Sequence, residues 1–150
     1  MKRNYLALTL IFLCLASCDT ARSKLDKSPF EMLAMAGLNL ETKYIVIIPQ
    51  NGCPSCIKKT YSFIMNHSES RKISYVFTHF ATKKEIRIYL NSMGVVNQDN
   101  FYFLDKSLGD EFGLSMMYPT LLEKTESGKN KITLMNSEDY SDWTLLEDNI

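Results

Sequence analysis

The sequence predicts an α/β fold of three layers, in which a mixed central sheet carries helices on both faces. Three observations predict it. Strand-like apolar runs alternate along the chain with helix-like segments, which is typical of parallel strands joined by crossover helices. The first of these runs has no polar alternation, as expected of a strand covered on both faces. Two strand-like segments around a turn sequence then add an antiparallel hairpin to the sheet.

The first half of the chain supplies a helix, a strand and a second helix. The segment Ser28-Pro29-Phe30-Glu31 has the pattern of a capping box with proline in the first turn. It predicts a helix over 29–36, which Gly37 ends. The apolar run Tyr44-Ile45-Val46-Ile47-Ile48 predicts a buried strand, and residues 53–67 follow it as a helix.

The next segment repeats the alternation of strand and helix. Ile73 to Phe77 predicts a second strand. Thr82 and Glu85 have the spacing of another capping box, which opens a helix that Gly94 stops. Phe101 to Leu104 predicts a third strand.

The last third of the chain completes the fold. Residues 106–112 predict a short helix. Residues 120–126 and 131–135 predict the two strands of a hairpin, because Ser-Gly-Lys-Asn lies between them. Trp143 lies in an acidic tail that predicts a final helix.

The charge balance excludes several functional classes. The 150 residues include 17 Lys and Arg against 17 Asp and Glu, a formal net charge of +0. A nucleic-acid binder needs a basic excess to neutralise phosphates, and so does a polybasic membrane-surface protein. The hydrophobic content of 45% supports a packed core. The sequence therefore predicts a globular domain with no nucleic-acid partner.

The N-terminus has the layout of a secretory signal. Met1-Lys2-Arg3 is a positive start, and the apolar run from Tyr5 to Leu15 is shorter than the roughly 20 residues of a transmembrane helix. Leu15-Ala16-Ser17-Cys18 resembles the lipobox of bacterial lipoproteins. The resemblance implies diacylglycerol on Cys18 and cleavage before it. The alternatives are an ordinary signal peptide with a chance cysteine, or a buried N-terminal helix.

The lipobox divides the chain into three parts. Residues 1–17 are the expected lipoprotein signal peptide, 18–27 a tether, and 28–150 the folded domain. The mature protein is expected to be exported and lipid-anchored to a bacterial membrane, facing the periplasm or the cell surface. Of the four cysteines, only Cys53 and Cys56 then remain as thiols, in a compartment where disulfides persist.

Cys53-Pro54-Ser55-Cys56 lies between the buried strand and the helix that follows it. A thiol at a helix N-terminus faces unpaired backbone N–H groups and the positive end of the helix dipole, which stabilise a thiolate. Lys58 and Lys59 add positive charge on what is expected to be a solvated face. Cys53 is predicted to be the exposed nucleophile and Cys56 the thiol that resolves a mixed disulfide.

Two other readings of this cysteine pair remain open. A zinc site needs two further ligands, and the two histidines, His67 and His79, do not have the spacing of a zinc finger. A purely structural disulfide in so short a loop stabilises little. His67 is expected to complement a helix C-terminus, and His79 is a weaker candidate for a proton shuttle.

The region from about Lys43 to Met135 resembles the thioredoxin superfamily, specifically exported thioredoxin-like lipoproteins. The resemblance rests on the strand, the cysteine motif and its helix, and on Tyr118-Pro119-Thr120 before the hairpin. It implies a thioredoxin-like three-layer sandwich, a cis proline at Pro119 and a substrate-docking residue at Tyr118. Met116 and Met117, just before them, are expected to fill the core more readily than to line a surface.

The chain departs from thioredoxins at two places. Gly52 stands where thioredoxins carry a tryptophan before the first cysteine. The strand from Tyr44 to Ile48 lacks the buried aspartate that thioredoxins carry, so proton transfer at Cys56 has no evident carboxylate partner.

The sequence thus predicts a membrane-anchored thiol–disulfide oxidoreductase without cofactor or metal. Its expected partners are exported thiol or disulfide proteins and an upstream thiol electron donor. The alternative is a non-catalytic lipoprotein of the same fold that binds a partner or Cu(I), with Cys53–Cys56 as a structural disulfide.

Overall fold

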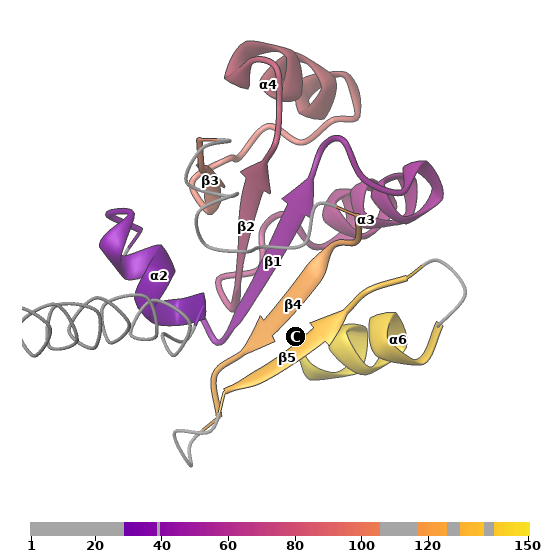
Figure 1. Ribbon diagram of the computed structural model, residues 1–150. Coiled ribbons are helices and arrows are strands. Elements are labelled where there is room, and N and C mark those ends of the chain that lie inside the picture. Colours follow the sequence, from indigo (N-terminus) through magenta and orange to yellow (C-terminus); the bar gives the residue numbers. More distant parts are fainter. Residues whose placement is uncertain (1–28, 39, 106–116, 126–129, 137–139) are drawn as a thin grey trace, which may run out of the picture.

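The computed structural model of the chain describes residues 29–38, 40–105, 117–125, 130–136 and 140–150 (Figure 1). The elements in chain order are α2 (Pro29–Met35), β1 (Tyr44–Pro49), α3 (Pro54–His67), β2 (Ile73–Thr78), α4 (Lys83–Ser92), β3 (Phe101–Phe103), β4 (Thr120–Glu123), β5 (Lys131–Leu134) and α6 (Tyr140–Asn149). The predicted signal peptide, tether and 106–112 helix lie outside the described residues. Within the described ranges, no helix is both long and apolar enough to cross a membrane.

The five strands form one mixed sheet in the order β3-β2-β1-β4-β5. β1 pairs in parallel with β2, and β2 in parallel with β3. β4 runs antiparallel to β1, and β5 antiparallel to β4, so the predicted hairpin closes the sheet. β1 therefore lies at the centre, with Ile47 between Val76 on one side and Thr120 on the other. This is the mixed sheet that the alternation of strands and helices predicts.

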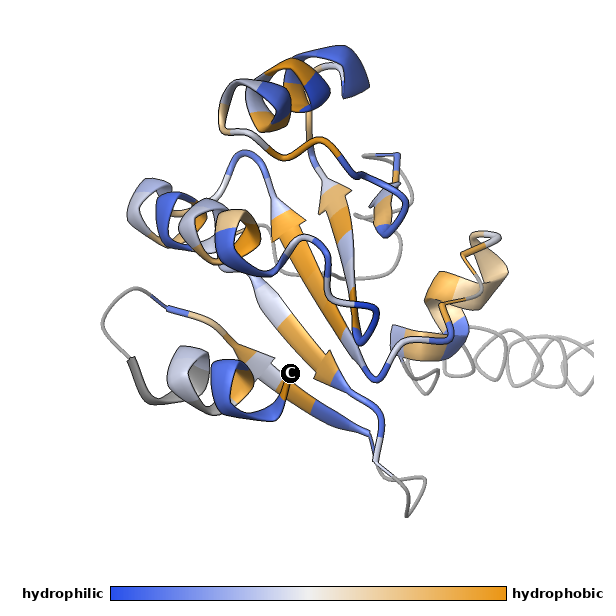
Figure 2. Ribbon diagram, turned by 180° about the vertical axis from the view of Figure 1, so that it is seen from behind, coloured by the Kyte–Doolittle hydropathy of each residue, from blue (hydrophilic) through white to orange (hydrophobic). Residues whose placement is uncertain are grey.

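The helices cover both faces of the sheet. Buried residues of α3, α4 and α6 share one core with alternate residues of the strands, among them Ile64, Leu90 and Trp143. On the other face, Leu33 of α2 packs against Ile47 and the strand residues that alternate with the first set. Figure 2 shows the apolar strands of the sheet with α3 and α6 in front of them and polar residues on the outer sides of the helices. The predicted three-layer arrangement is confirmed.

Local sequence signals account for where the helices begin and end. The Oγ1 of Thr82 accepts a hydrogen bond from the backbone N–H of Glu85 at 3.2 Å, which is one half of the predicted capping box. Gly37 and Gly94 follow α2 and α4 with φ angles of 78° and 85°. A residue with a Cβ is strained in this left-handed region, so glycine is suited to both helix ends.

Candidate active site

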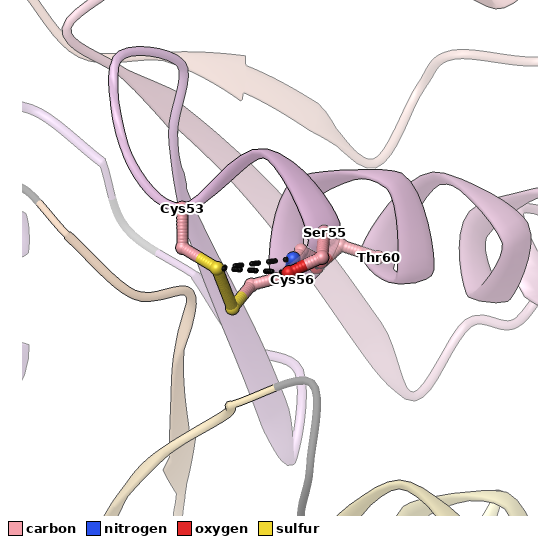
Figure 3. The surroundings of a disulfide bond; sticks show 4 residues. All are labelled: Cys53, Ser55, Cys56 and Thr60. Carbon is pink, nitrogen blue, oxygen red and sulfur yellow. Dashed lines mark hydrogen bonds between the residues drawn. A yellow bond between two sulfur atoms is a disulfide. The ribbon is translucent and has the colours of Figure 1, made fainter.

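The cysteine motif occupies the turn between the central strand and its helix (Figure 3). Cys53 is the N-cap residue of α3 and Pro54 lies in the first turn, where its missing N–H removes no hydrogen bond. Cys53 and Cys56 form a disulfide, with their Cα atoms 5.3 Å apart. The two predicted reactive residues are thus brought together by a single helical turn.

Two donors lie close to the sulfur of Cys53. The backbone N–H of Cys56 points to Cys53 Sγ at 3.4 Å, and Ser55 Oγ lies 3.2 Å from the same sulfur (Figure 3). When the disulfide is reduced, both groups can donate to a thiolate at Cys53. The N-terminal end of a 14-residue helix adds a positive potential at the same place. The site therefore favours negative charge on Cys53.

The two sulfurs differ sharply in access. Cys56 is 1% exposed, whereas Cys53 is partly exposed at the start of the helix. A sulfur from another molecule can therefore reach Cys53, while Cys56 is shielded by the core. The assignment of Cys53 as the nucleophile and Cys56 as the resolving thiol stays a prediction, for which this difference in exposure is the physical basis.

The segment before β4 lies against the cysteine motif. The backbone N–H of Cys53 donates to the carbonyl oxygen of Met117 at 2.7 Å. Tyr118 is 36% exposed next to this contact, and Pro119 is buried. Met117 is 58% exposed, so the expectation that it fills the core is wrong. Met116 lies outside the described residues.

The peptide bond between Tyr118 and Pro119 is trans, in contrast to the predicted cis bond. The described residues contain no cis peptide bond, so the predicted cis bond at Pro119 is wrong and the bond is trans. The trans form of an X–Pro bond is favoured by about 0.5–1 kcal/mol, which local context must overcome to produce the cis form. Here the Met117 carbonyl already pairs with Cys53 while the bond is trans.

The positive charges near the motif are placed differently from each other. Lys58 is exposed, as expected. The Nζ of Lys59 is instead buried and lies 5.9 Å from the centre of the Trp143 ring of α6. The prediction of a solvated Lys59 is therefore wrong, because α6 covers this side of α3. Lys59 helps to hold these two helices together through its contact with an aromatic face.

The two histidines lie at opposite ends of the structure's central strands. His67 ends α3, with Nε2 3.9 Å from a carboxylate oxygen of Glu147. His79 follows β2, is 1% exposed and has a φ of 53°, with Nδ1 2.9 Å from Thr78 Oγ1. Thr78 pairs in register with Pro49 of β1, so His79 follows β2 at the same end of the sheet at which the cysteine motif follows β1. A role for it in proton transfer stays a prediction.

Some residues of the site leave no local signal in the sequence. The Met117 carbonyl reaches Cys53 only because the sheet brings β4 beside β1. The hydroxyl of Tyr61 donates to Gln50 Oε1 at 2.8 Å, and both residues line the same cavity as Gly52 and Pro54 of the motif region. Burial raises the pKa of Tyr61 from 10.0 to about 12, partly offset by this hydrogen bond, so the phenol stays neutral.

No metal-binding cluster is found in the part of the chain that the structure describes: no three His, Cys, Asp or Glu side chains there are grouped to hold an ion. Cys18, the predicted lipid attachment site, lies outside these residues.

The chain was compared with protein families, with curated sequences and with solved structures, and only solved structures are similar to it. No protein-family model and no curated protein sequence matches the chain. Three solved chains are similar, and two of them are as follows. The first is the solution structure of a proposed thioredoxin from Neisseria meningitidis, at 20% identity and a TM-score of 0.46 over 73% of this chain and 75% of that one. The second is the crystal structure of a secreted Mycobacterium tuberculosis disulfide oxidoreductase homologous to E. coli DsbE, at 16% identity and a TM-score of 0.47 over 73% of this chain and 81% of that one.

Proposed function

We propose that this chain is a thiol–disulfide oxidoreductase that exchanges disulfides with exported proteins through Cys53 and Cys56. One observation carries the proposal: a disulfide joins a partly exposed cysteine at a helix N-terminus to a cysteine that is 1% exposed one turn later. Such a pair offers one sulfur to a partner and keeps the second in reserve. A purely structural disulfide that closes so short a loop would add little to the free energy of unfolding.

In the reductive direction, the thiolate of Cys53 attacks one sulfur of a partner's disulfide. A mixed disulfide forms, and the partner's other sulfur leaves as a thiolate that takes up a proton. The thiolate of Cys56 then attacks Cys53 Sγ, forms the Cys53–Cys56 disulfide and releases the partner's second thiol. Two electrons and two protons pass to the partner, and an upstream thiol protein restores the dithiol. The same steps run backwards in an oxidative role.

The segment beside the motif supports a docking role for Tyr118, whereas Pro119 next to it is buried. A partner bonded to Cys53 lies next to Met117, because the amide of Cys53 pairs with the Met117 carbonyl. The half-exposed Tyr118 follows directly and offers both an apolar ring and a backbone to an extended chain. We assign it to substrate docking.

The proposed location is a bacterial membrane surface facing the exported compartment. Its support is the N-terminal sequence, in which a short apolar run is followed by Leu15-Ala16-Ser17-Cys18. Lipid on Cys18 would hold the domain near the bilayer through the 18–27 tether. Cys18→Ala in the full chain is expected to abolish the incorporation of labelled fatty acid into the protein; unchanged labelling of this variant would contradict lipid attachment at this residue.

Single-cysteine variants test the reaction. With insulin or a scrambled disulfide protein as substrate, Cys53→Ser is expected to abolish exchange. Cys56→Ser is expected to abolish turnover but to accumulate a mixed disulfide on Cys53, visible on a non-reducing gel. Full activity in both variants would end the proposal. A reduction potential below about −300 mV would instead favour the alternative, a structural disulfide.

A further inference from the structure

A cavity of about 610 Å³ lies beside the cysteine motif. One wall is the loop after β1 and the first two turns of α3, and the other is the loop after β2 and α4. Its volume falls within the roughly 300–1,000 Å³ of typical ligand sites. It also lies at the carboxyl ends of two parallel strands, β1 and β2, where open α/β sheets bind ligands.

The cavity is lined mainly by apolar and aromatic side chains. The rings of Tyr61 and Tyr89 meet edge to face with their centres 4.8 Å apart, so α3 and α4 form a continuous aromatic wall. Phe80 also lines the cavity and packs edge to face on Phe103, at 5.8 Å between centres. Tyr89 remains 49% exposed, so this aromatic surface is accessible. Such a wall suits another aromatic ring.

The charges at the cavity balance each other. Lys58 lines it from α3 and Glu85 from α4, and both side chains are exposed. Since one positive and one negative group face the same space, the cavity favours a neutral occupant over an anion such as a phosphate. The charges stay in water and leave the apolar wall uncovered.

The cavity borders the cysteine motif on both sides of Cys53 in the chain. Gly52 and Pro54, the two neighbours of Cys53 in the chain, both line it. Gly52 has no side chain, so this part of the wall is backbone. A peptide that is disulfide-bonded to Cys53 would therefore be attached between two residues that line the cavity.

We propose that this cavity is a specificity pocket that receives an aromatic side chain of the substrate protein, from a residue that flanks the substrate cysteine. The inference rests on the proposed function, since it requires a substrate bonded to Cys53. An aromatic side chain buries roughly 150–250 Å² of surface. A buried aromatic residue of this size is typical of the few anchor residues that supply most of the binding energy at an interface.

The test compares two short peptides whose single cysteine is disulfide-capped with 2-mercaptoethanol. One carries Phe at the positions flanking the cysteine and the other carries Ser. The reduced protein attacks the peptide sulfur, which forms a peptide–Cys53 disulfide and expels 2-mercaptoethanol, and Cys56 then closes the protein disulfide and frees the peptide thiol. The rate of free-peptide release is measured by chromatography. Bis(2-hydroxyethyl) disulfide, which has no side chain to dock, reports basal exchange.

The unaltered protein is expected to react with the Phe peptide on the order of tenfold faster than with the Ser peptide. Ala81→Trp places a large ring in the cavity, since Ala81 lines it and is exposed. It is expected to abolish the preference while exchange with the small disulfide stays within about twofold. Ile88→Trp is the matched control, because Ile88 lies on α4, is 57% exposed and does not line the cavity; it should keep the preference.

Three results would overturn the inference. Equal rates for both peptides, with normal exchange of the small disulfide, would remove the pocket and leave the proposed function standing. No reaction with any of the three disulfides would remove the function and the pocket together. If circular dichroism shows Ala81→Trp to be unfolded, Tyr89→Ala removes one aromatic wall instead, and an unchanged preference in that variant would also reject the pocket.

Discussion

The backbone amide of Cys53 donates a hydrogen bond of 2.7 Å to the carbonyl oxygen of Met117. This bond joins the cysteine motif to the segment that enters β4, although the two are far apart in the chain. It fixes the position of Tyr118 relative to the reactive sulfur, because Tyr118 is the next residue. Under the proposed function, a partner bonded to Cys53 would therefore lie beside this segment.

Tyr118→Ala is expected to slow exchange with a disulfide protein by about tenfold, the equivalent of roughly 1.4 kcal/mol for one interface side chain. Exchange with bis(2-hydroxyethyl) disulfide should change by less than about twofold, since so small a molecule makes little use of the ring. Met35→Ala, an exposed apolar residue on α2, serves as control. Equal slowing of both reactions by Tyr118→Ala would argue against a docking role.

Ser55→Ala is expected to lower the reactivity of reduced Cys53 toward iodoacetamide by about two- to fourfold, at a pH where the thiol is mostly protonated. Loss of a donor 3.2 Å from Cys53 Sγ lowers the thiolate fraction. The remaining thiolate is a stronger nucleophile, which offsets about half of that effect. Ser62→Ala is the matched control, because the Ser62 hydroxyl donates to the Lys58 carbonyl on the exposed side of the same helix. Equal rates for Ser55→Ala and the control would contradict the assignment.

Trp143→Ala is expected to reduce the free energy of unfolding by about 3–5 kcal/mol, the usual cost of removing a buried aromatic side chain. Trp143 is 4% exposed and its ring centre lies 5.2 Å from that of Phe63, so it anchors α6 to α3. Urea unfolding followed by circular dichroism measures the change. Trp143→Phe should lose less than half as much, because Trp143 Nε1 is buried without a hydrogen-bond partner in the described part of the chain. A loss below about 1 kcal/mol for Trp143→Ala would mean that α6 is dispensable.

The stability of the unaltered protein is expected to fall as the pH rises from 10 toward 12. Burial raises the pKa of Tyr61 from 10.0 to about 12, so the unfolded state loses this proton first. Below pH 10 the phenol is neutral in both the folded and the unfolded state, and the fold keeps its full stability. By pH 12 about 2 kcal/mol of the free energy of unfolding is lost, because the unfolded state has released the proton. Tyr75 adds to the effect, since burial raises its pKa as well.

Tyr61→Phe isolates the Tyr61 share of this pH dependence. The variant should lose about 1 kcal/mol at neutral pH with its hydrogen bond to Gln50, and then show a shallower decline above pH 10. Urea unfolding midpoints at several pH values give both quantities. Identical declines in the two proteins would mean that Tyr61 is not protected by burial.

The features that depend on near neighbours in the chain could be predicted from the sequence. The unbroken apolar run of β1 indicates burial on both faces, and all six of its residues are buried. The Thr82–Glu85 spacing marks the start of α4, and the cysteine spacing brings two sulfurs together at one helical turn. Each of these is set by backbone geometry within a few residues.

The features that depend on packing between distant segments could not be predicted. The Cys53–Met117 hydrogen bond follows from strand order, which no local pattern encodes. The Nζ of Lys59 is buried because α6 packs over this side of α3. The position of Lys59 within α3 would fit a solvent-exposed helix face equally well, so the sequence alone gives no sign of this burial. The trans bond before Pro119 likewise departs from what its neighbours in sequence imply. The cavity beside the motif combines residues of two helices that are adjacent only in the folded chain.

The strand that leads into the cysteine motif is, with β2, one of two strands in the described sheet whose residues are all buried. β1 has a hydrogen-bonded strand on each side, and every one of its residues is buried, whereas β5 at the edge is mostly exposed. Amide hydrogen exchange should therefore be slowest in β1 and β2 and fastest at the β5 edge, since local opening begins where fewest contacts must break. Under the proposed function, the disulfide would then form and break at a turn that is anchored to the slowest-opening part of the sheet. A redox cycle would therefore leave the rest of the fold undisturbed.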